Sequence, residues 1–121
     1  MPPRRDDLYL ADILEAAESI RRFLGRLDEP GREGFLGDDL VRSAVLQKLS
    51  IIGEAAARVG EETKAAHPEV PWKQARGMRN LLVHAYFSVD WDVVFTTATD
   101  AVPRLAGQIE KILEASDSEA L

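Results

Sequence analysis

Apolar residues recur at helical spacing along most of this 121-residue chain, and no other feature constrains its fold more strongly. Between residues 10 and 27, an apolar side chain returns every three or four positions. The members of this run are Leu10, Ile13, Leu14, Ala17, Ile20, Leu24 and Leu27. Such spacing places side chains on one face of an α-helix, whereas a half-buried strand alternates at every second residue. Because the sequence contains no strand-like alternation, it predicts an all-α protein.

Boundary residues divide this pattern into helices. The first helix is expected over residues 5–27, followed by a loop over residues 28–34 that contains one proline and two glycines. The second is expected from Asp38-Asp39 to residue 66, because carboxylates favour a helix N-terminus and His67-Pro68 ends the helix. The middle of this second helix, residues 51–57, includes one glycine and three alanines, which would let another helix approach closely.

Proline and capping residues define two further helices. Pro71 suits the first residue of a third helix, because its missing N–H costs nothing there. Ser88 or Asp90 is expected to cap a fourth helix, and Pro103 to kink that helix or to change its hydrogen bonding locally. Four amphipathic helices joined by short loops predict an antiparallel four- to five-helix bundle with a kinked last helix.

Length and composition narrow the class of protein. We expect a single domain over residues 1–115 and a flexible acidic tail over residues 116–121. The chain has no cysteine, and its two histidines, His67 and His84, lie far apart, so we expect neither a disulfide nor a metal site. The N-terminal residues lack the apolar core of a signal peptide, and no apolar run could span a membrane. A soluble, cytoplasmic protein without a membrane partner is therefore expected.

The formal net charge of −6 bears on nucleic-acid binding. A protein that bound nucleic acid over its whole surface would usually be basic. If RNA is the ligand, it must therefore bind to a local basic patch or to a cleft in a dimer.

Residues 79–86 combine several chemically capable side chains within an apolar helical run. His84 can gain or lose a proton near neutral pH, and Arg79 carries a permanent positive charge. Asn80 and Tyr86 can both donate and accept hydrogen bonds, and Arg76 adds a second cation one turn earlier. Polar groups in such a run must either find partners in the fold or take part in chemistry.

Helical geometry separates these side chains into two groups. At about 100° per residue, Arg76, Asn80 and His84 lie along one face, whereas Arg79 and His84 are about 140° apart. Three arrangements could still bring Arg79 close to His84. The long arginine side chain could reach around the helix, the helix could bend or end between them, or a second copy of the helix could face the first.

Each residue also has an ordinary structural explanation. Arg79 could be the ion-pair partner of a carboxylate such as Glu54 or Asp92. His84 could be a hydrogen-bonded structural residue, and Tyr86 a core aromatic with an exposed hydroxyl. Gly77 lowers helix stability, so it could mark either close packing or a join between two helical segments.

The spacing Arg79-Asn80-x3-His84-x-Tyr86 resembles the Arg-x4-His-x-Tyr motif of HepT-like toxins, which are ribonucleases of the HEPN superfamily. The resemblance covers most of the chain. It extends to residues 52–56, to Pro71-Trp72, to Gly77-Met78 directly before the motif, and to Pro103 in the last helix.

The resemblance implies a HEPN-type helical bundle with endoribonuclease activity that needs no metal or other cofactor. It implies a homodimer in which two motif helices line one cleft, with RNA rather than DNA as the substrate. The implied partner is a small nucleotidyltransferase antitoxin of the MNT type. In such systems the antitoxin can transfer AMP to the motif tyrosine, here Tyr86, and thereby silence the toxin.

The residue types fit this chemistry. RNA cleavage without a metal needs a base for the 2′-hydroxyl, an acid for the leaving 5′-oxygen and positive charge at the phosphorus. His84 can transfer the protons and Arg79 can bind the phosphate through two hydrogen bonds. Asn80, Arg76 and Tyr86 would position the substrate or His84.

Two other hypotheses compete with a ribonuclease. The chain could be a catalytically inactive HEPN helical module that binds a nucleotidyltransferase partner or a nucleotide, which the acidic composition favours. It could also be a dimerising helical bundle without any site.

Overall fold

The structure, a computed structural model, describes residues 4–83 and 89–120, and every regular element within these ranges is helical. Residues 1–3, 84–88 and 121 lie outside the described part of the chain, and with them His84 and Tyr86. The elements are α1 (Arg4–Leu24), α2 (Arg32–Leu36), α3 (Asp39–Arg58), α4 (Glu61–Ala66), α5 (Trp72–Gly77), α6 (Arg79–Val83), α7 (Trp91–Thr96), a π-helical segment (Thr97–Ala101) and α8 (Val102–Ala120).

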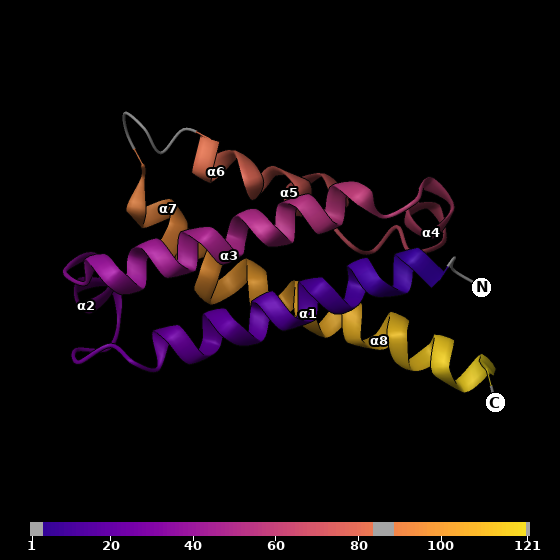
Figure 1. Cartoon of the computed structure of the whole chain (residues 1–121), viewed down its shortest axis with the longest axis horizontal. Coiled ribbons are helices and arrows are strands. Elements are labelled where there is room, and N and C mark those ends of the chain that lie inside the picture. Colours follow the sequence, from indigo (N-terminus) through magenta and orange to yellow (C-terminus); the bar gives the residue numbers. More distant parts are fainter. Residues whose placement is uncertain (1–3, 84–88, 121) are drawn as a thin grey trace.

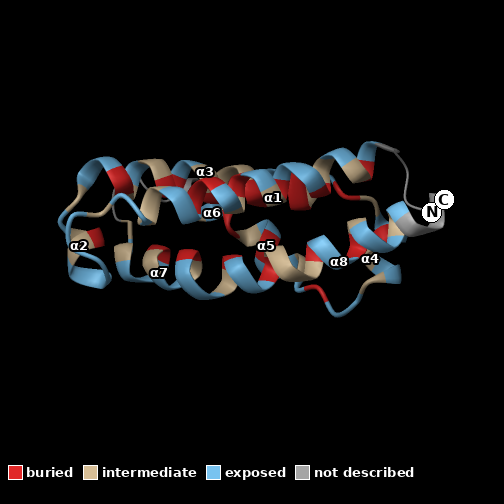
Figure 2. Cartoon of the chain, turned by 90° about the horizontal axis from the view of Figure 1, so that it is seen from below, coloured by how far each residue is buried: buried red, intermediate tan, exposed pale blue. Residues whose placement is uncertain are grey.

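Three long helices form the body of an antiparallel bundle (Figure 1). Helix α1 packs against both α3 and α8, and the two short helices α5 and α6 pack against α3. The inward sides of the helices carry the buried residues (Figure 2). The largest fully buried side chains are Phe35, Leu10, Ile13, Ile20, Leu49, Ile52, Leu105 and Ile109. The prediction of an all-α bundle is confirmed.

The predicted second helix is wrong in its length, because the chain leaves the helical conformation at Val59 and Gly60. Residues 39–66 form two helices, α3 and α4, instead of one. A carboxylate from α1 stabilises the interruption. Asp6, only 5% exposed, accepts hydrogen bonds from the Gly60 N–H at 3.1 Å and from the Thr63 hydroxyl at 2.6 Å. In a continuous helix the Gly60 N–H would donate to a backbone carbonyl one turn earlier. Here the Asp6 side chain accepts that hydrogen bond instead, so the break does not leave the Gly60 N–H without a partner.

The predicted third helix is also divided. Helix α5 begins at Trp72, directly after Pro71, and ends at Gly77, and α6 begins at Arg79. Of the two explanations for Gly77, the join between helical segments is the one found. A Cβ added at Gly77 would meet nothing within 4 Å, so close packing does not require glycine there.

The fourth helix begins as predicted at one of its two candidate caps. The Asp90 carboxylate accepts hydrogen bonds from the N–H groups of Asp92 and Val93, at 3.1 and 3.2 Å. Ser88 lies outside the described residues. The backbone switches to π-helical hydrogen bonding over Thr97–Ala101, just before Pro103, and then continues as α8. Pro103 therefore coincides with a local change in hydrogen bonding and does not interrupt the helix.

The helix ends differ from expectation in three places. Helix α1 ends at Leu24 instead of residue 27, and α2 forms where part of a loop was expected. Helix α8 continues to Ala120, through most of the expected tail, whose flexibility stays a prediction. None of the described helices is both long and apolar enough to cross a membrane.

We expect Asp6→Ala to destabilise the protein by about 1–3 kcal/mol, because it leaves the Gly60 N–H and the Thr63 hydroxyl without their buried acceptor. Urea unfolding followed by circular dichroism measures this loss. Asp12→Ala removes an exposed carboxylate from the same helix and should change the unfolding free energy by less than about 0.5 kcal/mol. Equal stability of the two variants would show that Asp6 does not hold the α3–α4 junction.

Candidate active site

The segment that contains the start of the motif packs directly on Gly53 in the middle of α3. A Cβ built on Gly53 would lie 2.7 Å from the Cβ of Arg79 and 3.0 Å from the carbonyl oxygen of Arg76, and closer still to the backbone nitrogen of Arg79. Because two of these three atoms belong to the backbone, no rotation of a side chain could relieve the contact. The prediction that residues 51–57 allow another helix to approach is confirmed, and the approaching helix is the motif helix.

Arg79 projects from this contact to the protein surface. Its Nη1 lies 3.4 Å from Oε1 of Glu54, one residue beyond Gly53, and the two side chains are 40% and 52% exposed. Of the two carboxylates considered as partners, Glu54 is the one found, since Asp92 pairs with Arg32 at 2.6 Å. An exposed pair of this length contributes only about 0–1 kcal/mol. The Arg79 guanidinium is therefore held near Glu54 but can exchange this partner for another anion.

Glu54 interacts with a second cation as well. Its Oε2 lies 3.9 Å from Nε of Arg58, one turn further along α3. A carboxylate shared between two arginines binds each of them less tightly than it would bind one alone, which again leaves Arg79 available for a substrate.

The other predicted residues are divided between the surface and the undescribed segment. Arg76 and Asn80 are both exposed, on either side of the turn at Met78. Helix α6 is continuous from Arg79 to Val83, so no break in the helix separates Arg79 from Val83. The predicted positions of His84 and Tyr86 lie outside the described residues, and the roles given to both stay predictions.

The structure contains a small basic pocket at Arg76 that the sequence did not predict. It has a volume of about 190 Å³ and is lined by Glu61, Lys64, Trp72, Lys73 and Arg76. Lys73, Arg76 and Arg79 recur every three residues, and this spacing could have indicated a line of cations leading away from the motif. Lys64 could not have been added from spacing, because it comes from α4.

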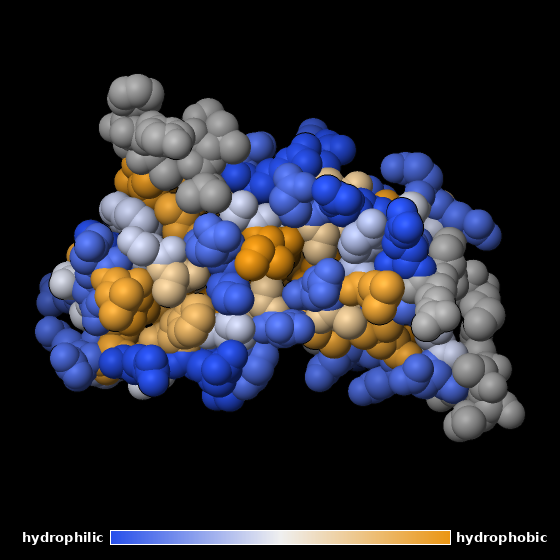
Figure 3. Space-filling model, in the orientation of Figure 1, coloured by the Kyte–Doolittle hydropathy of each residue, from blue (hydrophilic) through white to orange (hydrophobic). Residues whose placement is uncertain are grey.

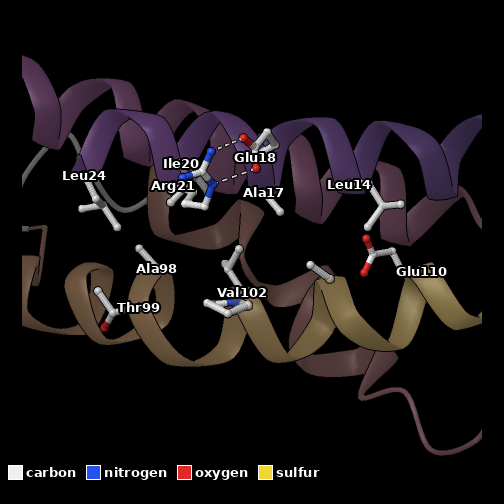
Figure 4. Close-up of a pocket in the computed structure, with 12 residues that line it drawn as sticks. Leu14, Ala17, Glu18, Ile20, Arg21, Leu24, Ala98, Thr99, Val102 and Glu110 are labelled. Carbon is white, nitrogen blue, oxygen red and sulfur yellow. Dashed lines mark hydrogen bonds and ion pairs between the residues drawn. The ribbon is translucent and has the colours of Figure 1, made fainter. Parts of the chain in front are cut away.

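A larger hollow lies elsewhere, between α1 and α8 (Figure 4). This groove of about 570 Å³ has mainly apolar walls, which include Leu14, Leu24 and Val102. At its rim Arg21 donates to Glu18 at 2.9 Å, and this hydrogen bond lowers the pKa of the Glu18 carboxyl. The groove contains none of the predicted site residues. Within the described ranges, no three histidine or carboxylate side chains are grouped so that they could hold a metal ion.

The chain belongs to the HepT-like ribonuclease family of the HEPN superfamily, because the model of the "Ribonuclease HepT-like" family matches residues 13–112. The resemblance inferred from the motif is thereby confirmed at the level of the family.

Curated relatives match over nearly their whole length. A probable ribonuclease HepT from Thermococcus cleftensis is 41% identical over 104 residues, which cover 86% of this chain and 92% of the relative. A putative RNase from Methanocaldococcus jannaschii is 33% identical over 114 residues, covering 94% and 92% of the two chains. A third, a putative RNase from Caldanaerobacter subterraneus, is 34% identical over 106 residues, covering 88% and 92%. No solved structure matches this chain.

We expect Gly53→Ala to destabilise the protein by about 1–3 kcal/mol, because the added methyl group collides with the backbone of the motif segment. Thermal and urea unfolding measure the change. Gly107→Ala is the matched control within α8, since its Cβ would meet nothing within 4 Å. That variant should gain roughly 0.5–1 kcal/mol from higher helix propensity. A Gly53→Ala protein as stable as Gly107→Ala would contradict the close contact.

Proposed function

We propose that this chain is the toxin of a cytoplasmic toxin–antitoxin system and acts as a metal-independent endoribonuclease. The observation that carries the proposal is the position of Arg79. The close fit of its backbone against Gly53 fixes the start of the motif helix, and its guanidinium is exposed with only a long, weak ion pair. A structural arginine would be expected to make a shorter, more buried pair. The relatives named as ribonucleases support the same activity.

In the proposed reaction the 2′-oxygen of a ribose attacks the adjacent phosphorus. His84 accepts the 2′-hydroxyl proton, a bond forms between the 2′-oxygen and phosphorus, and the bond from phosphorus to the 5′-oxygen breaks. A protonated His84 returns a proton to this leaving oxygen, so the products are a 2′,3′-cyclic phosphate and a free 5′-hydroxyl. Arg79 stabilises the negative charge that accumulates on the phosphoryl oxygens.

A homodimer provides the geometry that one helix lacks. Five residues along an ideal helix place Arg79 and His84 about 140° apart, and α6 shows no bend between Arg79 and Val83. If two motif helices face each other, Arg79 of one copy can serve His84 of the other. The same arrangement doubles the number of exposed arginines in the cleft, which compensates locally for the net charge of −6. Asn80 and Arg76 would position the RNA along this cleft.

We expect the purified protein to cleave single-stranded RNA in the presence of EDTA. His84→Ala should lower the rate roughly 10²- to 10⁴-fold by removing proton transfer. Arg79→Ala should lower it about 10²- to 10³-fold by removing the charge at the phosphate. Both can be measured on a fluorescent oligonucleotide, with circular dichroism to verify folding. Lys111→Ala, an exposed change on α8, is the control and should cleave at the wild-type rate. Cleavage that requires a divalent metal, or that survives both site variants, would refute the mechanism.

The proposed partner is a nucleotidyltransferase antitoxin of the MNT type that transfers AMP to Tyr86. The hydroxyl oxygen of Tyr86 attacks the α-phosphate of ATP, and pyrophosphate leaves. The new phosphodiester adds bulk and negative charge two residues from His84, and it would repel RNA.

We expect coexpression with such a nucleotidyltransferase to increase the mass of this chain by one adenylate group and to suppress cleavage. Tyr86→Phe should gain no adenylate group, and coexpression should not lower its own rate of cleavage, because it lacks the oxygen that is modified. Intact-mass spectrometry and the cleavage assay read out the two effects. Unchanged modification of Tyr86→Phe would place the acceptor at another residue.

The second candidate is an inactive HEPN helical module that binds the nucleotidyltransferase or a nucleotide. The acidic composition favours it, since 21 carboxylates exceed 15 lysines and arginines in the whole chain. Absence of RNA cleavage by the isolated chain, together with tight binding of the partner, would favour this second function.

A further inference from the structure

The basic pocket formed by Glu61, Lys64, Trp72, Lys73 and Arg76 joins two helices next to the motif. Lys64 comes from α4 and the other basic residues from α5. The Lys64 side chain is only 16% exposed, and it lines the pocket. In the view of Figure 3, hydrophilic side chains cover this edge of the molecule, above α5.

The cations of this pocket are weakly neutralised for a protein so rich in carboxylates. Elsewhere, Arg32 and Arg104 pair with Asp92 and Asp100 at 2.5 and 2.6 Å. In the described part of the chain, by contrast, neither Lys73 nor Arg76 has a carboxylate oxygen within 4 Å.

The carboxylate inside the pocket does little to change this balance. Lys64 pairs with Glu61 at a long 3.8 Å, and the Glu61 side chain is 95% exposed. Water screens a carboxylate that is so exposed. Three cations therefore converge where one solvated carboxylate is present, which favours an anionic ligand.

The pocket adjoins the candidate active site along the chain. Lys73 and Arg76 lie three residues apart in α5, roughly 4.5 Å along the helix axis, and Arg79 begins α6 three residues further on. Nothing but the turn at Met78 separates Arg76 from Arg79. An extended polyanion bound at Arg79 can therefore reach Arg76 and Lys73 with its neighbouring charges.

Trp72 gives the pocket an apolar wall with a fixed orientation. Its indole N–H donates to the backbone carbonyl of His67 at 2.9 Å, so the ring cannot rotate without breaking that hydrogen bond. The ring packs partly on the core, and its remaining surface lines the pocket. An aromatic wall beside lysines is the combination by which single-stranded nucleic acids are bound, through stacking and phosphate contacts together.

We propose that this pocket binds the nucleotide next to the scissile phosphate of a single-stranded RNA. Lys73 and Lys64 contact its phosphate, Arg76 bridges to the site at Arg79, and Trp72 packs against its base or ribose. This inference rests on the proposed ribonuclease function, yet it concerns binding, which can be measured without cleavage.

The binding test uses an RNA oligonucleotide methylated at every 2′-oxygen, which cannot be cleaved by the proposed reaction. Its dissociation constant is measured by fluorescence anisotropy over a range of salt concentrations for the wild type, Lys64→Met and Lys73→Met. Methionine preserves the buried stem and removes only the charge. Each variant should bind more weakly, and the slope of log affinity against log salt should fall by about 0.7 for each phosphate that is no longer neutralised. Lys111→Met makes the same charge change on α8 and should leave the slope unchanged.

The variants also separate this pocket from the catalytic step. On an oligonucleotide substrate, Lys73→Met should raise KM with little change in kcat, whereas on a dinucleotide, which has only the scissile phosphate, both constants should stay as in the wild type. Replacing Lys73 with arginine should restore the salt slope.

Different results identify which proposal fails. If binding shows the expected slopes but no RNA is cleaved, the pocket stands and the ribonuclease function falls. If Lys64→Met and Lys73→Met bind RNA like Lys111→Met, or if the wild type binds no RNA, the pocket proposal is wrong. Unchanged RNA binding with weakened binding of the nucleotidyltransferase would instead make the pocket a protein-docking surface.

Discussion

The contact between Gly53 and the backbone around Arg79 determines where the start of the candidate active site lies. Because no side chain stands between the two segments, α6 lies as close to α3 as backbones allow, and Glu54 is brought beside Arg79. Helix α3, which carries Gly53, is itself anchored in the core by its packing against α1. The rigid part of the fold thus positions a short helix that could not be stable by itself in water.

The sequence predicted the class of fold because apolar spacing is a local property. The places where it failed depend on contacts between distant residues. Gly60 weakens the helix after Val59, but the group that stabilises the break is not local, because the carboxylate that accepts the Gly60 N–H belongs to Asp6, 54 positions earlier. The join at Gly77, in contrast, could be considered from the sequence, since glycine weakens a helix wherever it occurs.

In the candidate site, too, the sequence predicted what depends on local spacing and not what depends on contacts between distant residues. The motif spacing identified Arg79, and the sequence left both Glu54 and Asp92 open as its carboxylate partner. Only the packing of α6 on α3 shows that the partner is Glu54. Lys73 could have been found from its interval of three residues to Arg76. Lys64 could not, because the turn through residues 67–71 determines which side chains of α4 and α5 share a pocket.

Glu54 has a consequence for how selective the site can be. An anion that binds Arg79 does not meet an empty cation but must displace a carboxylate that already lies near it. A ligand with a single diffuse charge gains little binding free energy from that exchange. A phosphodiester that several groups hold at once gains binding free energy at each of them. If Arg79 binds RNA as we propose, competition from Glu54 favours extended polyanions over the small anions that are abundant in any cell.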